Sequence, residues 1–305
     1  MSKKIIITGA TGFIGKKLSR ALIERGEQLT IFTQSIRKGK IETPNAYEYV
    51  KWDYRSPREW EKHLEGKDAV IHLAGANLFG RRWNKEYKKR IMESREISTR
   101  NLVKAISKAE KKPSVFISSS AVGYYGDSGD SILTEGSPYG ADFLASVCRR
   151  WESASADVEK LGVRRVSIRT GLILSTKEGA LKKMLVPFKL FVGGSLGDGK
   201  QWFPWVHIDD IIGIYLYALD NDNLKGPINA AAPNPVRMKE FTRTLGKILR
   251  RPSIFSVPEF VLRVVLGEFA YAVTSSLNVI PQKLKDINYK FKYERLEDAL
   301  RDLLY

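Results

Sequence analysis

The fold is decided by the stretch Lys3-Lys4-Ile5-Ile6-Ile7-Thr8-Gly9-Ala10-Thr11-Gly12-Phe13-Ile14-Gly15, near the amino end of the chain. The isoleucine run predicts a strand that is buried on both faces of a parallel sheet. Glycines at 9, 12 and 15 predict a tight strand-to-helix turn whose backbone closely approaches a ligand. The following helix, expected over 12–25, points free N–H groups and a positive partial charge at an anion. The stretch therefore predicts a dinucleotide site, with the pyrophosphate held by Gly9, Thr11, Gly12, Phe13, Ile14 and Gly15.

The composition is that of a folded protein. The chain has 305 residues, of which 43% are hydrophobic, enough for one large core or for a core with a smaller lobe. Cys148 is the only cysteine, so no intramolecular disulfide forms and we expect a cytoplasmic setting. We identify no signal peptide and no apolar run long enough to span a bilayer, so we expect no membrane partner.

The net charge of +17 has two interpretations. A basic surface binds nucleic acid through counterion release, and it also favours small anionic ligands. The basic residues are spread along the chain and no nucleic-acid motif accompanies them, so we expect no nucleic-acid partner. The sequence indicates no oligomeric state.

Alternating strand and helix patterns predict an α/β protein. We expect strands at 5–7, 28–33, 47–50, 68–73, 115–119 and 163–170, and helices at 12–25, 84–110, 142–161 and 180–192. The expected fold is a Rossmann-like doubly wound parallel sheet over residues 1–175, with a smaller, mainly helical carboxyl-terminal substrate lobe over residues 176–305. Residues 202–232 return to the sheet, and 193–199 form a glycine-rich loop.

The end of the second predicted strand bears on the choice of cofactor. An NAD site places Asp or Glu here to accept from the ribose hydroxyls. This chain has Thr33, Gln34 and Ser35, followed by Arg37 and Lys38. No carboxylate repels a 2′-phosphate, so the sequence favours NADP over NAD. The alternative is that Arg37 and Lys38 are ordinary loop charges.

Other candidate cofactor residues follow the third and fourth strands. Asp53 is placed either to meet an adenine amino group or to cap a helix that begins near Ser56-Pro57. Small residues from Leu73 through Ala74 and Gly75 to Asn77 allow a ligand to lie against the backbone. Arg90 and Arg95 on the next helix are either phosphate ligands or solvated charges.

Several motifs resemble those of the extended short-chain dehydrogenase/reductase superfamily. They are the glycine stretch, His72-Leu73-Ala74-Gly75, Ser118-Ser119-Ser120, Tyr125-Gly126, Arg169-x-Gly171 and His207-Ile208-Asp209-Asp210. Narrower motifs are similar to the subgroup of epimerase family proteins: Phe79-Gly80-Arg81-Arg82-Trp83, Ala121–Gly126, Phe143–Glu152, Gly197–His207, Ala232–Val236 and a helical piece over 251–304. The resemblance implies an NADP site that includes Thr33, Gln34, Leu73, Ala74, Arg95, Ser118 and Arg169. It also implies an oxidoreductase or a nucleotide-sugar epimerase with a small-molecule substrate that the sequence does not identify.

The catalytic pair of the superfamily is missing. Its chemistry uses a tyrosine and, four residues later, a lysine that lowers the pKa of the tyrosine. The corresponding residues are Leu144 and Cys148, and an alignment on Tyr139 places Phe143 where the lysine is needed. Ser120 remains the candidate for the serine that binds the substrate oxygen.

Three explanations of the missing pair stay open. Tyr124 or Tyr125 acts as the acid/base in its place, or Cys148 contributes, although a lone helical cysteine is more often a small buried hydrophobe. Alternatively, the protein is a catalytically inactive NADP(H)-binding redox sensor or regulatory protein. His207 and Asp209 are further candidate site residues, although His207 is expected to support the fold, and we expect no metal site.

Overall fold

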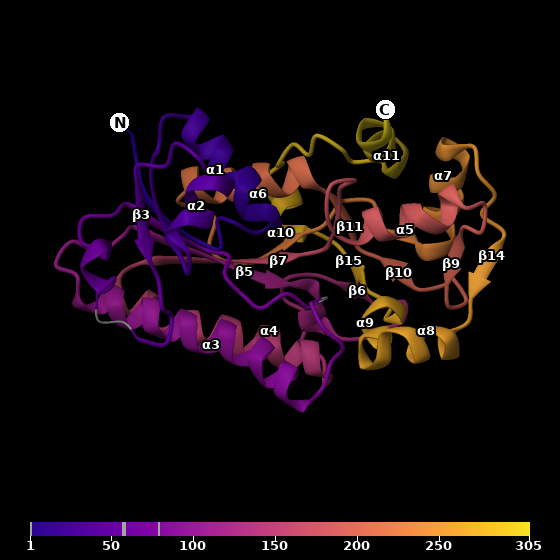
Figure 1. The fold of residues 1–305 in the computed structure, drawn as a ribbon, viewed down its shortest axis with the longest axis horizontal. Coiled ribbons are helices and arrows are strands. Elements are labelled where there is room, and N and C mark those ends of the chain that lie inside the picture. The colour runs from indigo at the N-terminus through magenta and orange to yellow at the C-terminus, as the bar shows by residue number, and fades with distance from the viewer. Residues whose placement is uncertain (1, 57–58, 79) are drawn as a thin grey trace.

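A seven-stranded parallel sheet forms the centre of the molecule, in the order β12-β7-β5-β4-β1-β2-β3 (Figure 1). We describe it from a computed structural model, which covers residues 2–56, 59–78 and 80–305. All six pairings in this sheet are parallel. The strands are β1 (Lys4–Thr8), β2 (Gln28–Thr33), β3 (Glu48–Lys51), β4 (Ala69–His72), β5 (Val115–Ala121), β7 (Arg164–Thr170) and β12 (Gly226–Ala230). The predicted doubly wound fold is confirmed.

The strand order changes direction at β1. β2 and β3 lie on one side of β1, whereas β4 and β5 lie on the other. β1 pairs with β2 on one side and with β4 on the other, and Thr8 is opposite His72 at the carboxyl ends of the two strands. Open α/β sheets bind their ligands in the crevice at such a point. The glycine stretch therefore begins at the position where this fold accommodates a ligand.

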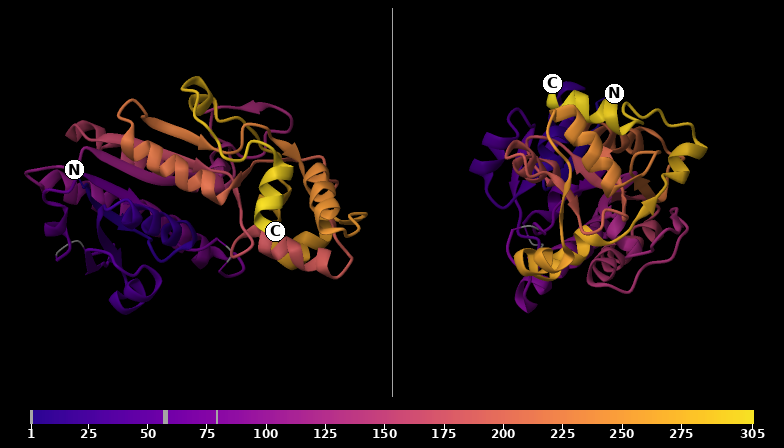
Figure 2. Two further views of the ribbon diagram at one scale, coloured as in Figure 1. Left: turned by 90° about the horizontal axis from the view of Figure 1, so that it is seen from above. Right: turned by 90° about the vertical axis from the view of Figure 1, so that its right-hand side faces the viewer.

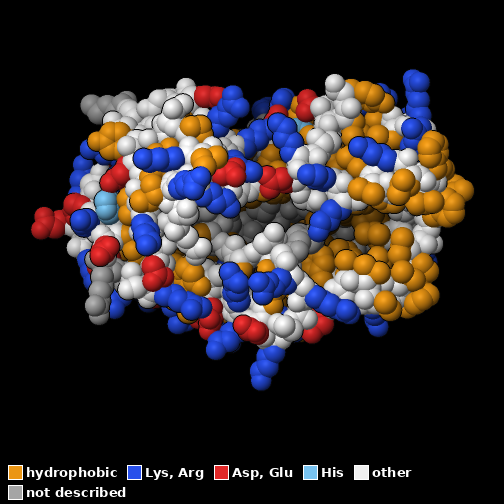
Figure 3. Space-filling view, in the orientation of Figure 1, with side chains coloured by type: hydrophobic (Ala, Val, Ile, Leu, Met, Phe, Trp, Pro, Cys, Tyr) orange, Lys and Arg blue, Asp and Glu red, His pale blue; other side chains and the backbone are white. Residues whose placement is uncertain are grey.

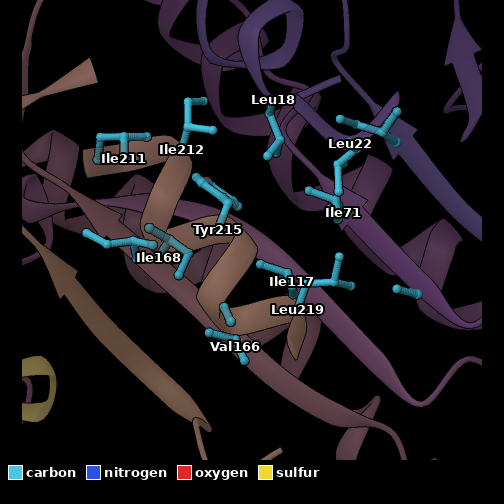
Figure 4. Close-up of a cluster of buried hydrophobic side chains, with 14 of the residues drawn as sticks. Leu18, Leu22, Ile71, Ile117, Val166, Ile168, Ile211, Ile212, Tyr215 and Leu219 are labelled. Atoms are coloured by element: carbon cyan, nitrogen blue, oxygen red, sulfur yellow. The ribbon is translucent and has the colours of Figure 1, made fainter. Parts of the chain in front are cut away.

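Helices cover both faces of the sheet (Figure 1). α1 (Phe13–Glu24) and α6 (Ile208–Asp220) lie on one face, and α3 (Lys85–Lys108) and α4 (Phe143–Ala156) lie on the other. Figure 4 shows Leu18 and Leu22 of α1, Tyr215 and Leu219 of α6, and side chains of β4, β5 and β7 in one buried hydrophobic cluster. This packing explains why Ile5–Ile7 is apolar on both sides.

A second lobe lies beyond the carboxyl edge of the sheet (Figure 2). Its core includes Phe203, Trp205 and Phe241. Four two-stranded pairings join its strands to each other or to the sheet's loops: β8 (Leu172–Leu174) with β11 (Trp205–His207), β9 (Gly194–Leu196) with β14 (Phe255–Val257), β10 (Trp202–Phe203) with β13 (Val236–Arg237), and β6 (Ile132–Leu133) with β15 (Asn278–Val279). The helices are α5 (Ala180–Lys189), α7 (Met238–Leu249), α8 (Glu259–Leu266), α9 (Ala270–Thr274), α10 (Gln282–Asp286) and α11 (Leu296–Leu304).

Local differences from the sequence-based expectations have simple causes. α2 (Ile36–Glu42) was not expected, because its sequence has no continuous apolar face; Ser35 caps it by accepting from the Lys38 N–H at 3.3 Å. The helix predicted to reach 161 ends at Ala156 and continues as a short 3-10 turn, η3 (Glu159–Leu161). β9 lies inside the stretch predicted to be a glycine loop. The remaining 3-10 turns are η1 (Glu61–Leu64), η2 (Val122–Tyr125) and η4 (Gly267–Phe269).

Two expectations fall partly outside the described residues. The helix start near Ser56-Pro57 includes Pro57, and the Phe79–Trp83 motif includes Phe79; neither residue is described. Among the described residues, no helix combines the length and the apolar character that crossing a bilayer needs.

Candidate dinucleotide site and buried polar cluster

Two glycines of the loop, Gly9 and Gly15, have no room for a side chain. Gly9 has a φ of +72°, and a Cβ there would lie 2.8 Å from the backbone of Leu73 and Ala74. A Cβ at Gly15 would lie 2.2 Å from the carbonyl oxygen of Gly9. Gly12 is the N-cap of α1 and offers no capping side chain, and the first turn holds no acidic residue. The N–H groups of that turn are therefore left for an external acceptor, which is the arrangement that binds phosphate.

A neutral histidine fixes the strand ends beneath this loop. His72 Nδ1 lies 2.7 Å from Thr8 Oγ1, and His72 Nε2 lies 3.1 Å from Ser98 Oγ. Thr8 Oγ1 also accepts from the Ala74 N–H at 3.3 Å. Burial, with a smaller contribution from the charge of Arg95, lowers the pKa of His72 to about 3. The imidazole therefore stays neutral at physiological pH and joins β1, β4 and α3 without carrying charge.

Arg95 lies directly behind the loop that follows β4. Its guanidinium donates to the carbonyl oxygens of Ala76 at 3.1 Å and Ile91 at 3.0 Å. A Cβ on Gly75 would lie 2.9 Å from Arg95 Cζ, so a larger residue there would displace the guanidinium. Burial lowers the pKa of Arg95 to about 10, which leaves it charged at neutral pH. Arg95 thus places a positive charge behind the backbone of Leu73, Ala74 and Gly75.

The other predicted cofactor residues surround the same edge. Thr33 Oγ1 lies 3.1 Å from the Ser35 carbonyl oxygen and turns the chain into α2, where Gln34 and Arg37 are exposed. The Asn77 carbonyl accepts from the Tyr87 hydroxyl at 2.5 Å.

Asp53 Oδ1 accepts from the Arg55 N–H, and Asp53 borders a surface hollow of about 450 Å³ between the end of β3 and the first turns of α3. Ser118 instead lies inside the sheet, with its hydroxyl 3.4 Å from Ser167 Oγ.

A buried polar cluster lies beyond the carboxyl ends of β5 and β7. Arg169 makes a bidentate pair with Glu152, with Nε–Oε1 and Nη2–Oε2 distances of 2.8 Å. The Ser120 hydroxyl donates to Glu152 Oε1 at 2.7 Å. Arg169 Nη1 donates to the Tyr125 hydroxyl at 3.0 Å, and that hydroxyl donates to Asn229 Oδ1 at 2.6 Å. The side chains of Arg169 and Glu152 are only 3% and 10% exposed. The cluster therefore holds a desolvated ion pair whose polar atoms are mutually satisfied.

This cluster separates the two tyrosine candidates. Burial raises the pKa of Tyr125 to about 12, and both hydrogen-bonding sides of its hydroxyl are engaged. Tyr124 is half-buried, and its ring lies face-on to Arg169, with 3.4 Å from Cζ to the ring centroid. Within the described part of the chain, no residue hydrogen-bonds the Tyr124 hydroxyl. Of the two tyrosines, Tyr124 has the hydroxyl that is free to meet a substrate.

Glu152 and Asn229 are the two residues of this cluster that were not predicted as site residues. Glu152 left a signal in the sequence. Its side chain lies on the buried face of α4, in the row Ala145, Cys148, Glu152 and Ser155. A carboxylate among small and apolar residues on one helix face indicates a buried ion pair, because a buried charge needs a partner. The partner, Arg169, is on a strand and is close only in the folded chain. Asn229, from β12, also joins through tertiary contact.

Of the residues at the positions of the missing pair, Cys148 is buried and Leu144 is partly buried. Leu144 lies under the η2 turn, 3.4 Å from where a Cβ on Gly123 would be. Cys148 is buried and contacts Ser120, with Arg95 also nearby. Its thiol therefore lies between the glycine-loop side of the crevice and the buried polar cluster.

We expect Cys148 to be unreactive in the folded protein. Burial, and then the charge of Glu152, raise the pKa of its thiol to about 12, so the thiolate that reacts with alkylating reagents is scarce at neutral pH. Iodoacetamide should not label the native protein between pH 7 and pH 9, and it should label one thiol in urea. Mass spectrometry checks this, and rapid native labelling would show that the site opens to solvent.

His207 caps α6. Its Nδ1 accepts from the Asp209 N–H at 3.1 Å, and its Nε2 lies 3.3 Å from Asp302 Oδ2. Because the Nδ1 lone pair is used by the backbone, the neutral ring carries its proton on Nε2, facing Asp302. Lys17 and Lys292 neutralise Asp209. These contacts join α1, α6 and the segment before α11.

Comparison with known proteins identifies the class. Residues 5–231 match the model of the NAD dependent epimerase/dehydratase family, and residues 257–303 match a domain of unknown function, DUF1731. The chain therefore belongs to the NAD dependent epimerase/dehydratase family, and the resemblance to extended short-chain dehydrogenases/reductases is confirmed.

Particular relatives cover nearly the whole chain. The chain is 41% identical over 302 residues to the epimerase family protein SDR39U1 homolog, chloroplastic, of Arabidopsis thaliana, covering 98% of this chain and 86% of that protein. The structure of human epimerase family protein SDR39U1 with NADPH has a TM-score of 0.87 at 31% identity, with 98% of each chain covered. UDP-glucuronic acid 4-epimerase from Bacillus cereus, with a TM-score of 0.79 at 19% identity over 98% of this chain and 97% of that one, shares the fold.

Proposed function

We propose that the protein binds NADP(H) in the crevice between β1 and β4, with the pyrophosphate on the glycine loop. The observation that carries this is the cradle at Gly9 and Gly15, where backbone atoms occupy the space of any Cβ. The human relative described with NADPH supports the same cofactor. When bound, the nicotinamide supplies hydride transfer. The chain's own residues hold the phosphates, carry charge near them and position the substrate.

The end of β2 supports the phosphorylated form of the cofactor. Thr33, Gln34 and Ser35 place no carboxylate beside the adenosine ribose, and Arg37 is exposed in the first turn of α2. A carboxylate there would repel a 2′-phosphate, whereas a guanidinium pairs with it. Asp53 borders the hollow that we assign to the adenine. Leu73, Ala74, Gly75 and Asn77 would lie along the dinucleotide, with Arg95 behind them.

For the reaction, we propose an oxidoreductase or epimerase of the short-chain type that acts on a small polar substrate. Ser120 lies at the carboxyl end of β5, and Glu152 accepts from its hydroxyl and so orients it. Tyr124 is the proposed proton donor, because its hydroxyl is free and its ring lies against the charged Arg169. Tyr125 and Arg169 become positioning residues, since their polar atoms are used within the cluster.

A second function is favoured by a specific observation. The positions of the usual tyrosine and lysine hold Leu144, which is partly buried, and Cys148, which is buried, and Ser120 already has a partner in Glu152. A protein of this construction that binds NADPH without turnover would be a redox sensor or a regulatory protein. An enzyme would turn over a substrate with NADPH, whereas a sensor or regulatory protein would bind NADPH without turnover.

Replacing Tyr124 distinguishes them. With NADPH and a panel of aldehydes, ketones and UDP-sugars, the wild-type protein should turn over at least one compound. Tyr124→Phe should then lower kcat by about 100-fold or more, the scale of a lost general acid, with the Kd for NADPH unchanged. Tyr139→Phe, a tyrosine beside Tyr124 that is half exposed, is the matched control. Tight NADPH binding without turnover of any compound would favour the regulatory function.

A further inference from the structure

The far end of the second lobe carries an apolar surface that the fold leaves uncovered. Its members lie on the end of α5 and the turn after it, on β14 with the residue before it, and on α8: Val186, Leu190, Phe191, Val192, Ile254, Phe255, Phe260, Val264 and Val265. Their exposures run from 49% at Phe255 to 81% at Ile254. We call this set the apolar end face. Figure 3 shows hydrophobic side chains gathered at that end of the molecule.

The three segments form one continuous surface. β14 pairs with β9 so that Phe255 is opposite Gly194, two residues after Val192. Arg251 lies over the Phe191 ring, 4.2 Å from Cζ to the centroid, and so joins the start of the β14 segment to the α5 turn. α8 follows β14 after Pro258. In Figure 1 β14 lies at one extreme of the long axis, so a flat partner reaches this face without meeting the rest of the molecule.

The turn after α5 exposes Phe191 in an unfavourable backbone conformation. Phe191 has a φ of +64°, which places it in the left-handed region. Its N–H bonds to Phe188 O and the Val192 N–H bonds to Pro187 O, the pattern in which glycine usually occupies this position. A bulky residue in this conformation is a genuine outlier. Its ring is nevertheless 55% exposed, so burial inside the monomer does not compensate for the cost.

α8 has apolar residues on its outer side as well as its inner side. Leu262 is its buried contact with the lobe, whereas Phe260 and Val264, one turn apart, face outward at 70% exposure each. The helix also carries the exposed Glu259–Arg263 pair, so it presents both charged and apolar groups to solvent. Its exposed Phe260 and Val264 can therefore enter a lipid headgroup boundary while the charged pair stays in water.

Positive charge accompanies the apolar end face. Lys189, Arg250 and Arg251 are exposed within a few residues of its members. The nearby acid Glu259 is paired with Arg263 at 2.7 Å. The chain as a whole carries a net charge of +17. A basic rim around exposed aromatic and aliphatic side chains fits an anionic lipid surface.

We propose that the apolar end face docks on an anionic phospholipid bilayer. Phe191, Phe260 and Val264 enter the headgroup boundary, and Lys189, Arg250 and Arg251 contact the lipid phosphates. A second copy of the chain is a poorer occupant, because a symmetric contact would bring the two basic rims together. The proposal revises the expectation of no membrane partner, which considered spanning segments alone. It is independent of the proposed cofactor and reaction.

Vesicle sedimentation with the full-length protein tests the proposal. At 0.1 M salt the protein should partition onto vesicles of equal phosphatidylglycerol and phosphatidylcholine, and it should stay in solution with phosphatidylcholine alone. Phe191→Gly should lower the partition coefficient about tenfold by removing an inserted ring. The same change should leave Tm unchanged or raise it, because glycine suits this backbone conformation. Loss of lipid binding is therefore separated from loss of folding.

Matched variants test the charges and the location. Lys189→Gln with Arg250→Gln should weaken binding about fivefold for each charge removed. Lys104→Gln with Lys111→Gln, which removes the same charge from the exposed surface around the end of α3, should have a much smaller effect. Tyr47→Ser, at a residue 70% exposed beside β3, should have none. Absent binding to the anionic vesicles, equal effects of test and control variants, or a dimer that Phe260→Ser converts to monomer would each overturn the proposal.

Discussion

Glu152→Gln should destabilise the folded protein by about 3–5 kcal/mol. The substitution keeps the size of the side chain but removes the charge that balances Arg169, whose side chain is only 3% exposed. The guanidinium then stays buried without a counterion, and the Ser120 hydroxyl loses its charged acceptor. Breaking one partner of a buried pair costs more than the pair itself contributes, because the remaining charge stays desolvated. Urea unfolding followed by tryptophan fluorescence measures the change.

An exposed pair supplies the control for Glu152. Glu24 lies 2.9 Å from Arg20 Nε, and the side chains are 63% and 81% exposed. Glu24→Gln should cost less than about 1 kcal/mol, because solvent screens the pair. Similar effects of the two substitutions would contradict the arrangement of the buried polar cluster.

Gly15→Ala should weaken NADPH binding by about 100-fold. Its Cβ would lie 2.2 Å from Gly9 O and 2.7 Å from Ala10 Cα, and both are backbone atoms that cannot rotate away. The loop must move, and the amides that would hold the pyrophosphate move with it. Losing one or two charge-assisted hydrogen bonds, at about 1.5–3 kcal/mol each, accounts for the expected change. Isothermal titration calorimetry gives the Kd.

Gly26→Ala is the control that shows whether replacing any glycine weakens NADPH binding, or only one in the glycine loop. Gly26 has a φ of +80°, and nothing lies within 4 Å of where its Cβ would be. Alanine there should cost about 1–2 kcal/mol of stability through the left-handed conformation alone, with NADPH affinity unchanged. An affinity of Gly15→Ala within a factor of three of wild type would exclude the glycine loop as the phosphate site.

The central sheet is predictable from the sequence because its signals are local. Ile5–Ile7 and Ala69–Ile71 are apolar on both faces, as parallel strands between two helix layers must be, and the glycine turn fixes the first helix. α2 was missed because it depends on a Ser35 cap and lacks a continuous apolar face. β9 was missed because Gly194 carries no strand signal and is fixed by pairing with Phe255.

The candidate site is less predictable, because its polar groups are set by long-range contacts. The glycine loop is contiguous in sequence and could be named from it. Glu152, Arg169 and Asn229 come from α4, β7 and β12, and only the fold shows that they share one cluster with Tyr125. Their pairing also separates the roles of Tyr124 and Tyr125, which the spacing alone left equivalent.

The most direct test of the account is a pair of fluorescence titrations, with NADPH and with NADH, on the wild-type protein and on Arg37→Ala. Wild type should bind NADPH at least about tenfold more tightly than NADH, since a charge-assisted contact is worth about 1.5–3 kcal/mol. Arg37→Ala should remove most of that preference without weakening NADH, and Lys40→Ala serves as the control, because Lys40 is the basic residue in the last turn of the same helix. Tighter binding of NADH by the wild-type protein would contradict the account.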